Sequence, residues 1–158
     1  MMPKRMLAKR YHDVSVGHRV VGHEGKCRFL HGHNYRVTFH VAGEELDALG
    51  RVLDFGQIKS TLCEWLEENW DHKFLADTND PLVNAICKGL KEHVDHAEYM
   101  SFLRGIVWVP FNPTAEKMAE YLVEVIGPMV LEGTGCVLVA VEVGETAKCS
   151  VLYTKEGN

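Results

Sequence analysis

Residues 27–41 have the sequence CRFLHGHNYRVTFHV, and the second half of this stretch decides the fold. Within 35–41, apolar and polar residues alternate, so that Val37, Phe39 and Val41 share one side of an extended chain. Such alternation is typical of a strand in an antiparallel sheet with one covered face. The stretch therefore predicts a half-buried strand.

Two histidines stand two positions apart just before this strand. In an extended chain His31 and His33 point to the same side, because successive side chains alternate between faces. Neutral imidazole nitrogens are good ligands for zinc, and Gly32 between them adds no side chain that would keep the backbone away. A His-x-His pair alone does not define a metal site, so a further ligand has to come from elsewhere in the chain.

The composition is that of an ordinary globular protein, since 46% of the 158 residues are hydrophobic and 25% are charged. This length predicts a single domain over 1–158. The net charge is -5 and the sequence has no basic block, so it lacks the clustered positive charge that is typical of nucleic-acid binding. No apolar run approaches the roughly 20 residues that span a bilayer, so we expect no membrane segment. Five cysteines without dense spacing indicate reduced thiols and a cytoplasmic location.

The remaining elements follow from periodicity and from helix-capping residues at Asp54, Asp80 and Thr114. In chain order we expect strands at 6–21, 35–41 and 51–55, a helix from Asp54 to about Asn69, a connector at 70–75, a helix at 81–94, a strand at 106–109, a helix after Thr114, and strands at 136–143 and 150–153. This order predicts an α+β fold with helices on one face of a mainly antiparallel sheet. The polar segment up to Arg104 is interpreted as part of a mobile excursion at about 76–110.

His18 is the candidate third ligand. A solvated histidine at a strand end is the plainer interpretation. If the first strand pairs with the strand at 35–41, however, His18 comes to the same edge as His31 and His33. Three neutral histidines with an open fourth position form the catalytic type of zinc site.

Cys27 has three interpretations. It could be a buried small hydrophobe, as free cysteines commonly are. It could be a fourth, structural metal ligand. It could also be a catalytic thiolate, activated by the positive charge of Lys26, Arg28 and a metal.

Two acidic motifs complete the candidate set. Asp71-His72 could be a plain turn after a helix, or an acid/base relay in which the carboxylate fixes the imidazole tautomer. Glu145, in a Gly-Glu-Thr turn, could be a surface glutamate or could bind a ring edge bearing N–H groups, such as that of a pterin.

These motifs, taken in order, resemble the 6-pyruvoyl-tetrahydropterin synthase / 6-carboxy-tetrahydropterin synthase family. The matching motifs are His18, Cys27-x-x-x-His31-Gly32-His33-Asn34-Tyr35, Asp54-Phe55, Asp71-His72, Asn112-Pro113-Thr114-Ala115-Glu116 and Glu145-Thr146. They cover nearly the whole chain. The three residues between Cys27 and His31 are similar to the spacing of the carboxy branch.

The resemblance implies a tunnelling fold (T-fold), with a four-stranded antiparallel sheet and helices on one face. It implies that subunits close their sheets into an oligomeric β-barrel, in a homohexamer with active sites at subunit interfaces. The implied site residues are His18, His31 and His33 for Zn²⁺, Cys27, Asp71 and His72 for proton transfer, and Glu145 and Thr114 for the pterin ring. The Asp71-His72 pair would come from a neighbouring subunit.

The implied reaction is a lyase reaction in queuosine-type deazapurine biosynthesis. It converts 7,8-dihydroneopterin triphosphate to 6-carboxy-5,6,7,8-tetrahydropterin and releases acetaldehyde and triphosphate. The triphosphate of this implied substrate needs cations, and Arg19, Lys26 and Arg28 are near enough in sequence to propose for it. The alternative within the family is 6-pyruvoyl-tetrahydropterin synthase, which eliminates triphosphate and keeps all side-chain carbons. Two further alternatives lie outside the family. One is a non-catalytic zinc-stabilised oligomerisation module, in which Cys27 is the fourth ligand, and the other is a zinc hydrolase, in which Glu24 is the general base.

Overall fold

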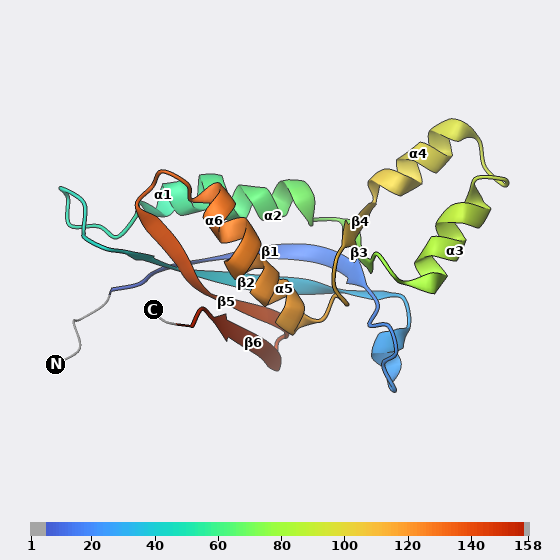
Figure 1. The fold of residues 1–158 in the computed structure, drawn as a ribbon, viewed down its shortest axis with the longest axis horizontal. Helices are drawn as coiled ribbons and strands as arrows, with labels where there is room; N and C mark the ends of the chain where they lie inside the picture. The colour runs from blue at the N-terminus through green and yellow to red at the C-terminus, as the bar shows by residue number, and fades with distance from the viewer. Residues whose placement is uncertain (1–5, 157–158) are drawn as a thin grey trace.

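A computed structural model describes residues 6–156, and its centre is a six-stranded mixed sheet with the strand order β4-β3-β1-β2-β5-β6 (Figure 1). The strands are β1 (Ala8–His18), β2 (His31–Gly43), β3 (Lys73–Asp77), β4 (Ile106–Val109), β5 (Cys136–Thr146) and β6 (Cys149–Thr154). Strands β1, β2, β5 and β6 pair antiparallel, whereas β3 pairs parallel with both β1 and β4. The α+β prediction is confirmed.

The expected count of four strands is wrong, because a short parallel pair extends the sheet beyond β1. The predicted connector at 70–75 ends in β3, where Leu75 and Ala76 are buried. The predicted strand at 106–109 is confirmed and lies beside β3 as β4. The predicted strand end at 51–55 is also wrong, since helix α1 begins at Phe55.

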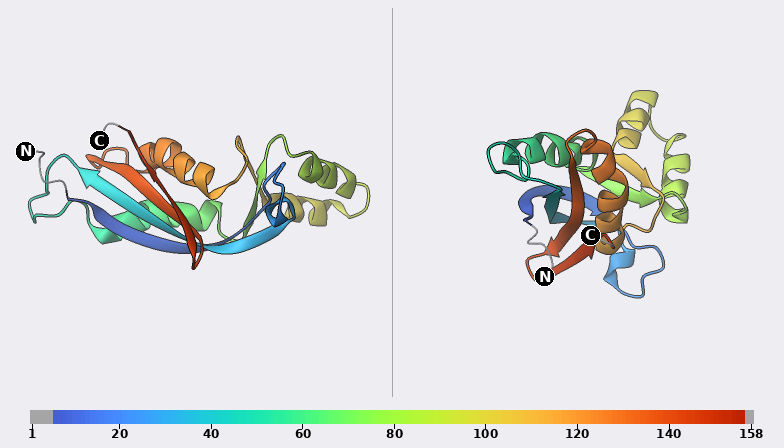
Figure 2. Two further views of the ribbon diagram at one scale, coloured as in Figure 1. Left: turned by 90° about the horizontal axis from the view of Figure 1, so that it is seen from below. Right: turned by 60° about the vertical axis from the view of Figure 1, so that its left-hand side comes forward.

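The helices form three groups. One continuous helical run comprises α1 (Phe55–Ile58), a π-helical turn (Lys59–Cys63) and α2 (Glu64–Asn69); a second comprises α5 (Ala115–Tyr121), a π-helical turn (Leu122–Ile126) and α6 (Gly127–Val130). Both cover the same side of the curved sheet (Figure 2). Their buried side chains, such as Leu62 and Met118, share one core cluster with Val37 and Phe39 of β2.

The third group stands at one end of the molecule, where the sequence predicts a mobile excursion (Figure 1). It consists of α3 (Pro81–Leu90) and α4 (His96–Arg104), so the helix predicted at 81–94 ends earlier and a second helix follows it. The three predicted caps are confirmed: Asp54 accepts from the Gly56 amide, Asp80 from the Leu82 and Val83 amides, and Thr114 from the Lys117 amide. No helix within the described residues is long and apolar enough to cross a membrane.

Gly127 marks a close contact between α6 and the sheet. A methyl group added there would lie 2.7 Å from Leu138 Cβ in β5. We expect Gly127→Ala to lower the free energy of unfolding by about 1–3 kcal/mol through overpacking, against a helix-propensity gain of about 1 kcal/mol. Gly89→Ala in α3 is the matched control, because apart from its chain neighbours and the backbone of its own helix no heavy atom of the described residues lies within 4 Å of its added methyl group. Urea denaturation of both variants checks this, and equal stabilities would contradict it.

Candidate active site

The three predicted metal ligands form one cluster on the helix-covered side of the sheet. Antiparallel pairing places His18 of β1 directly opposite His31 of β2, and Val16 opposite His33. One ring nitrogen from each histidine lies within 4.8 Å of the others. The structure therefore confirms that His18 joins the pair. His31 and His33 lie inside β2, where the strand fixes their spacing.

Backbone carbonyls orient two of the three rings. His18 Nδ1 donates to the carbonyl of Pro113 at 2.7 Å, and His31 Nδ1 donates to the carbonyl of Phe29 at 2.7 Å. A ring nitrogen that donates leaves Nε2 of a neutral imidazole as the acceptor. Both rings thus hold the tautomer that a metal ligand needs, because Nδ1 is hydrogen-bonded to a backbone carbonyl and Nε2 is left to bind the metal.

The third ring supplies a test of whether the cluster fits a metal ion. His33 Nε2 is buried and has no hydrogen-bond partner within residues 6–156, and the nearest carboxylate oxygen, Glu145 Oε1, lies 3.5 Å away. A buried polar atom without a partner is costly. Because two neighbouring rings present acceptor nitrogens to the same place, the three residues fit a shared cation.

Burial favours the neutral, metal-binding form of two of these imidazoles, His18 and His33. It lowers the pKa of His18 and that of His33, with the neighbouring histidines acting in the same direction. The buried Tyr35 hydroxyl lies 3.0 Å from His18 Nε2, and burial raises its pKa, so Tyr35 remains a neutral phenol beside the cluster. At neutral pH the His18 and His33 rings therefore offer lone pairs rather than positive charge.

A cavity of about 300 Å³ beside the histidines brings several predicted residues together. It is lined by His18, Cys27, Thr114 and Glu145, and also by His23 and Cys149, for which the sequence predicts no role at the site. Cys27 is half-buried on a single 3₁₀ turn, Lys26–Arg28, between β1 and β2. The arrangement places a thiol and a carboxylate at the edge of the histidine cluster. The individual roles of these residues stay predictions.

The sequence predicts that Glu145 lies in a turn, and this prediction is wrong. Strand β5 continues through Thr146, and Glu145 occupies a bulge between the pairs Gly144–Ser150 and Thr146–Cys149. An extra residue in one strand bends it and changes the direction of a side chain. Because of the bulge, Glu145 of β5 has no partner residue in β6, and its carboxylate faces His33.

The Asp71-His72 pair lies apart from Cys27. Asp71 accepts from the Ser15 amide at 2.8 Å and from His72 Nδ1; burial opposes ionisation, but these hydrogen bonds hold the pKa of Asp71 below its usual value. His72 adopts a left-handed backbone with φ of 56°, and its side chain is 80% exposed. This geometry agrees with an Asp-oriented imidazole that is open to a reactant.

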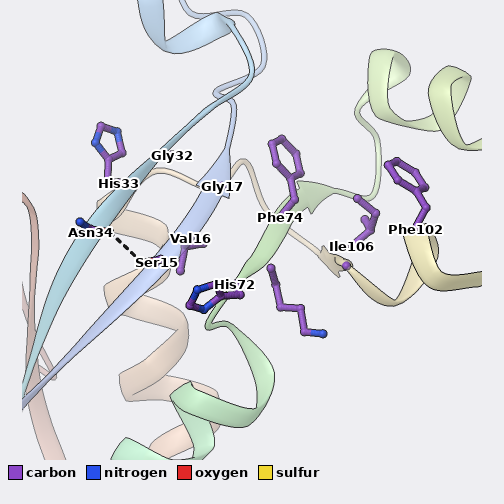
Figure 3. Close-up of a pocket in the computed structure, with 12 residues that line it drawn as sticks. Ser15, Val16, Gly17, Gly32, His33, Asn34, His72, Phe74, Phe102 and Ile106 are labelled. Carbon is purple, nitrogen blue, oxygen red and sulfur yellow. Dashed lines mark hydrogen bonds between the residues drawn. The ribbon is translucent and has the colours of Figure 1, made fainter.

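His72 lines a different cavity of about 570 Å³, together with His33 of the histidine cluster, with Phe74 and with Phe102 of α4. In Figure 3 the rings of His72 and His33 lie on either side of the β1–β2 pair. Neither Cys27 nor Glu145 lines this cavity, and neither Asp71 nor His72 lines the one beside Cys27. One chain therefore does not unite the predicted proton-transfer residues.

Comparison with known proteins gives consistent results. The family model of 6-pyruvoyl tetrahydropterin synthase matches residues 7–156. The chain is 32% identical over 139 residues to 6-carboxy-5,6,7,8-tetrahydropterin synthase of Rickettsia felis, covering 88% of this chain and 93% of that protein. It is 33% identical over 135 residues to the Aquifex aeolicus protein of the same name, covering 83% and 77%.

Solved structures show the same fold. An uncharacterised protein, WS1659 from Wolinella succinogenes, matches with a TM-score of 0.83 at 24% identity, over 97% of this chain and 99% of that one. The 6-pyruvoyl tetrahydropterin synthase of Caenorhabditis elegans matches with a TM-score of 0.64 at 21% identity, over 97% of both chains. The T-fold prediction is thereby confirmed. The chain belongs to the 6-pyruvoyl tetrahydropterin synthase family of enzymes.

Proposed function

We propose that this enzyme, a lyase by its family, is a zinc-dependent 6-carboxy-5,6,7,8-tetrahydropterin synthase. Its substrate would be 7,8-dihydroneopterin triphosphate, and acetaldehyde and triphosphate would leave. The observation that carries the proposal is the three-histidine cluster beside Cys27 in a chain whose relatives bear that name. A role in queuosine-type biosynthesis stays a prediction.

His18, His31 and His33 would hold the metal through their Nε2 atoms, since Nδ1 of the first two is bound to backbone carbonyls. Bound there, zinc supplies Lewis acidity that lowers the pKa of substrate hydroxyl groups. Three imidazoles with an open fourth position form the catalytic type of zinc site, which is why zinc is the metal proposed.

The other residues would bind the substrate and move protons. The Cys27 thiolate, in the cavity that also holds His18, would move a proton at the substrate side chain. The Glu145 carboxylate would accept hydrogen bonds from the pterin N–H edge, which fixes the ring relative to the cluster. Thr114 lines the same cavity and would contact the ring.

His72 would serve a site completed by a second subunit, in a homohexamer whose sheets close into a barrel. Support comes from the separation of Asp71-His72 from Cys27 within one chain and from the 80% exposure of the His72 side chain. Asp71 would orient His72 through its hydrogen bond to Nδ1. His72 Nε2 would then exchange the proton with the substrate of the neighbouring chain.

Product analysis tests the proposal. The zinc-loaded enzyme is expected to release acetaldehyde and triphosphate from 7,8-dihydroneopterin triphosphate in equal amounts, because the carboxy product has lost two side-chain carbons. Acetaldehyde is measured by coupled reduction and triphosphate by chromatography. Triphosphate without acetaldehyde would instead identify a 6-pyruvoyl-tetrahydropterin synthase. Release of neither would refute both assignments.

A further inference from the structure

The loop between β1 and β2 carries Cys27, and two hydrogen bonds join the turn at Cys27 to the two residues that directly follow β1. The Val20 amide donates to the Cys27 carbonyl at 2.8 Å, and Arg19 donates through a terminal guanidinium nitrogen to the Arg28 carbonyl at 3.0 Å. Phe29, the next residue, provides the carbonyl that orients His31. The backbone before Arg28 therefore positions the Cys27 thiol, and the backbone after it orients His31, a predicted metal ligand.

Arg19 is itself held by a carboxylate from the excursion. Its Nε donates to Asp80 Oδ2 at 2.7 Å, and the side chains of Arg19 and Asp80 are only 15% and 1% exposed. The other Asp80 oxygen, Oδ1, accepts from the amides of Leu82 and Val83 at the start of α3. The planar guanidinium therefore holds two acceptors at a fixed spacing, one on the loop and one on the excursion.

This contact joins the excursion to the loop and occupies two nitrogens of the Arg19 guanidinium, which argues against Arg19 as a ligand of the triphosphate. A buried charge is costly without its partner, so we expect Arg19 to remain paired with Asp80 rather than to bind the triphosphate. We propose that Asp80 is a positioning residue, which acts through Arg19 to hold the turn that carries Cys27. The inference rests on the proposed role of Cys27 in the carboxy-tetrahydropterin synthase reaction.

Asp80→Asn in the zinc-loaded full-length enzyme tests the contact, because asparagine is an equally good helix cap but lacks the charge that holds Arg19. We expect kcat to fall by about tenfold or more, as for a displaced reacting group, with KM and zinc content near the wild-type values. We also expect faster alkylation of Cys27 by iodoacetamide, followed on its peptide by mass spectrometry, because a loosened turn exposes the half-buried thiol.

Asp95→Asn is the matched control. Asp95 caps α4 by accepting from the Glu98 amide at 2.9 Å, and among the described residues its side chain has no hydrogen bond to the loop. This variant is expected to keep the wild-type kcat and alkylation rate. If it shows the same losses as Asp80→Asn, the effect belongs to the helices in general and the proposal fails.

The Arg19→Met/Asp80→Asn double variant removes both charges, so that neither is left buried alone. We compare the double variant with the single variants Arg19→Met and Asp80→Asn. If the two residues act as one contact, the kcat of the double variant is expected to equal that of the more impaired single variant, since coupled effects do not add. Losses that multiply, or a wild-type alkylation rate in Asp80→Asn, would overturn the inference. Alkylation needs no substrate, so this result is independent of whether the wild-type enzyme forms acetaldehyde.

Discussion

The Cys27→Ala variant is expected to keep its metal and to lose turnover by about 10²–10⁴-fold, the usual contribution of a positioned acid/base group. Cys27 lines the cavity beside His18, whereas the proposed metal-binding nitrogens come from His18, His31 and His33. Zinc content should therefore remain near one per chain, as a three-histidine site requires. Elemental analysis and the rate of acetaldehyde release measure the two quantities on the same sample.

Cys149→Ala provides the control, because Cys149 is an exposed cysteine that lines the same cavity. We expect it to retain most of its activity. Loss of zinc in Cys27→Ala would make Cys27 a ligand and would favour the oligomerisation module. Mixing Cys27→Ala subunits with His72→Ala subunits extends the test, since activity should return if one chain lends His72 to the cavity of another.

His31→Ala is expected to lose both metal and activity. Removing a ligand should weaken zinc binding by more than the roughly 10–100-fold that loss of an outer hydrogen-bond partner costs. Zinc at about 100 times its Kd should raise the unfolding free energy of the wild-type protein by about 2.7 kcal/mol, and that of His31→Ala hardly at all. Denaturation with and without zinc measures this independently of activity.

His40→Ala is the matched control for His31→Ala. His40 belongs to the same strand and its Nε2 is also buried without a partner among residues 6–156, but its even position places it on the opposite face of β2. The zinc-dependent stabilisation should survive in this variant. A wild-type zinc affinity in His31→Ala would show that the ion binds elsewhere.

The parts of the fold that sequence reasoning predicts best are those with local causes. The alternation around Val37 and Phe39 predicts β2, and the capping side chains of Asp54, Asp80 and Thr114 place three helix starts correctly. The cluster of His18 with His31 and His33 could also be foreseen, because antiparallel pairing brings a strand end opposite a strand start.

The missed features depend on contacts between distant parts of the chain. Strand β3 is only five residues long, and it becomes a strand through parallel pairing with β1 and β4. The carbonyls of Pro113 and Phe29 orient the histidines, and every residue has a carbonyl, so no residue type reveals them. The Arg19–Asp80 contact joins positions 61 apart in the sequence. These features become visible only when the chain is folded.

The bulge at Glu145 separates the proposed ring contact of that carboxylate from the strand pairing of its hairpin. The pairs Gly144–Ser150 and Thr146–Cys149 hold β5 to β6, and Glu145 contributes to neither. A change of side chain there leaves the ladder of hydrogen bonds intact. With the proposed role of Glu145 in binding the pterin ring, position 145 is one at which we expect the accepted ring to change at little cost to folding, which makes it a starting point for redesigning substrate preference.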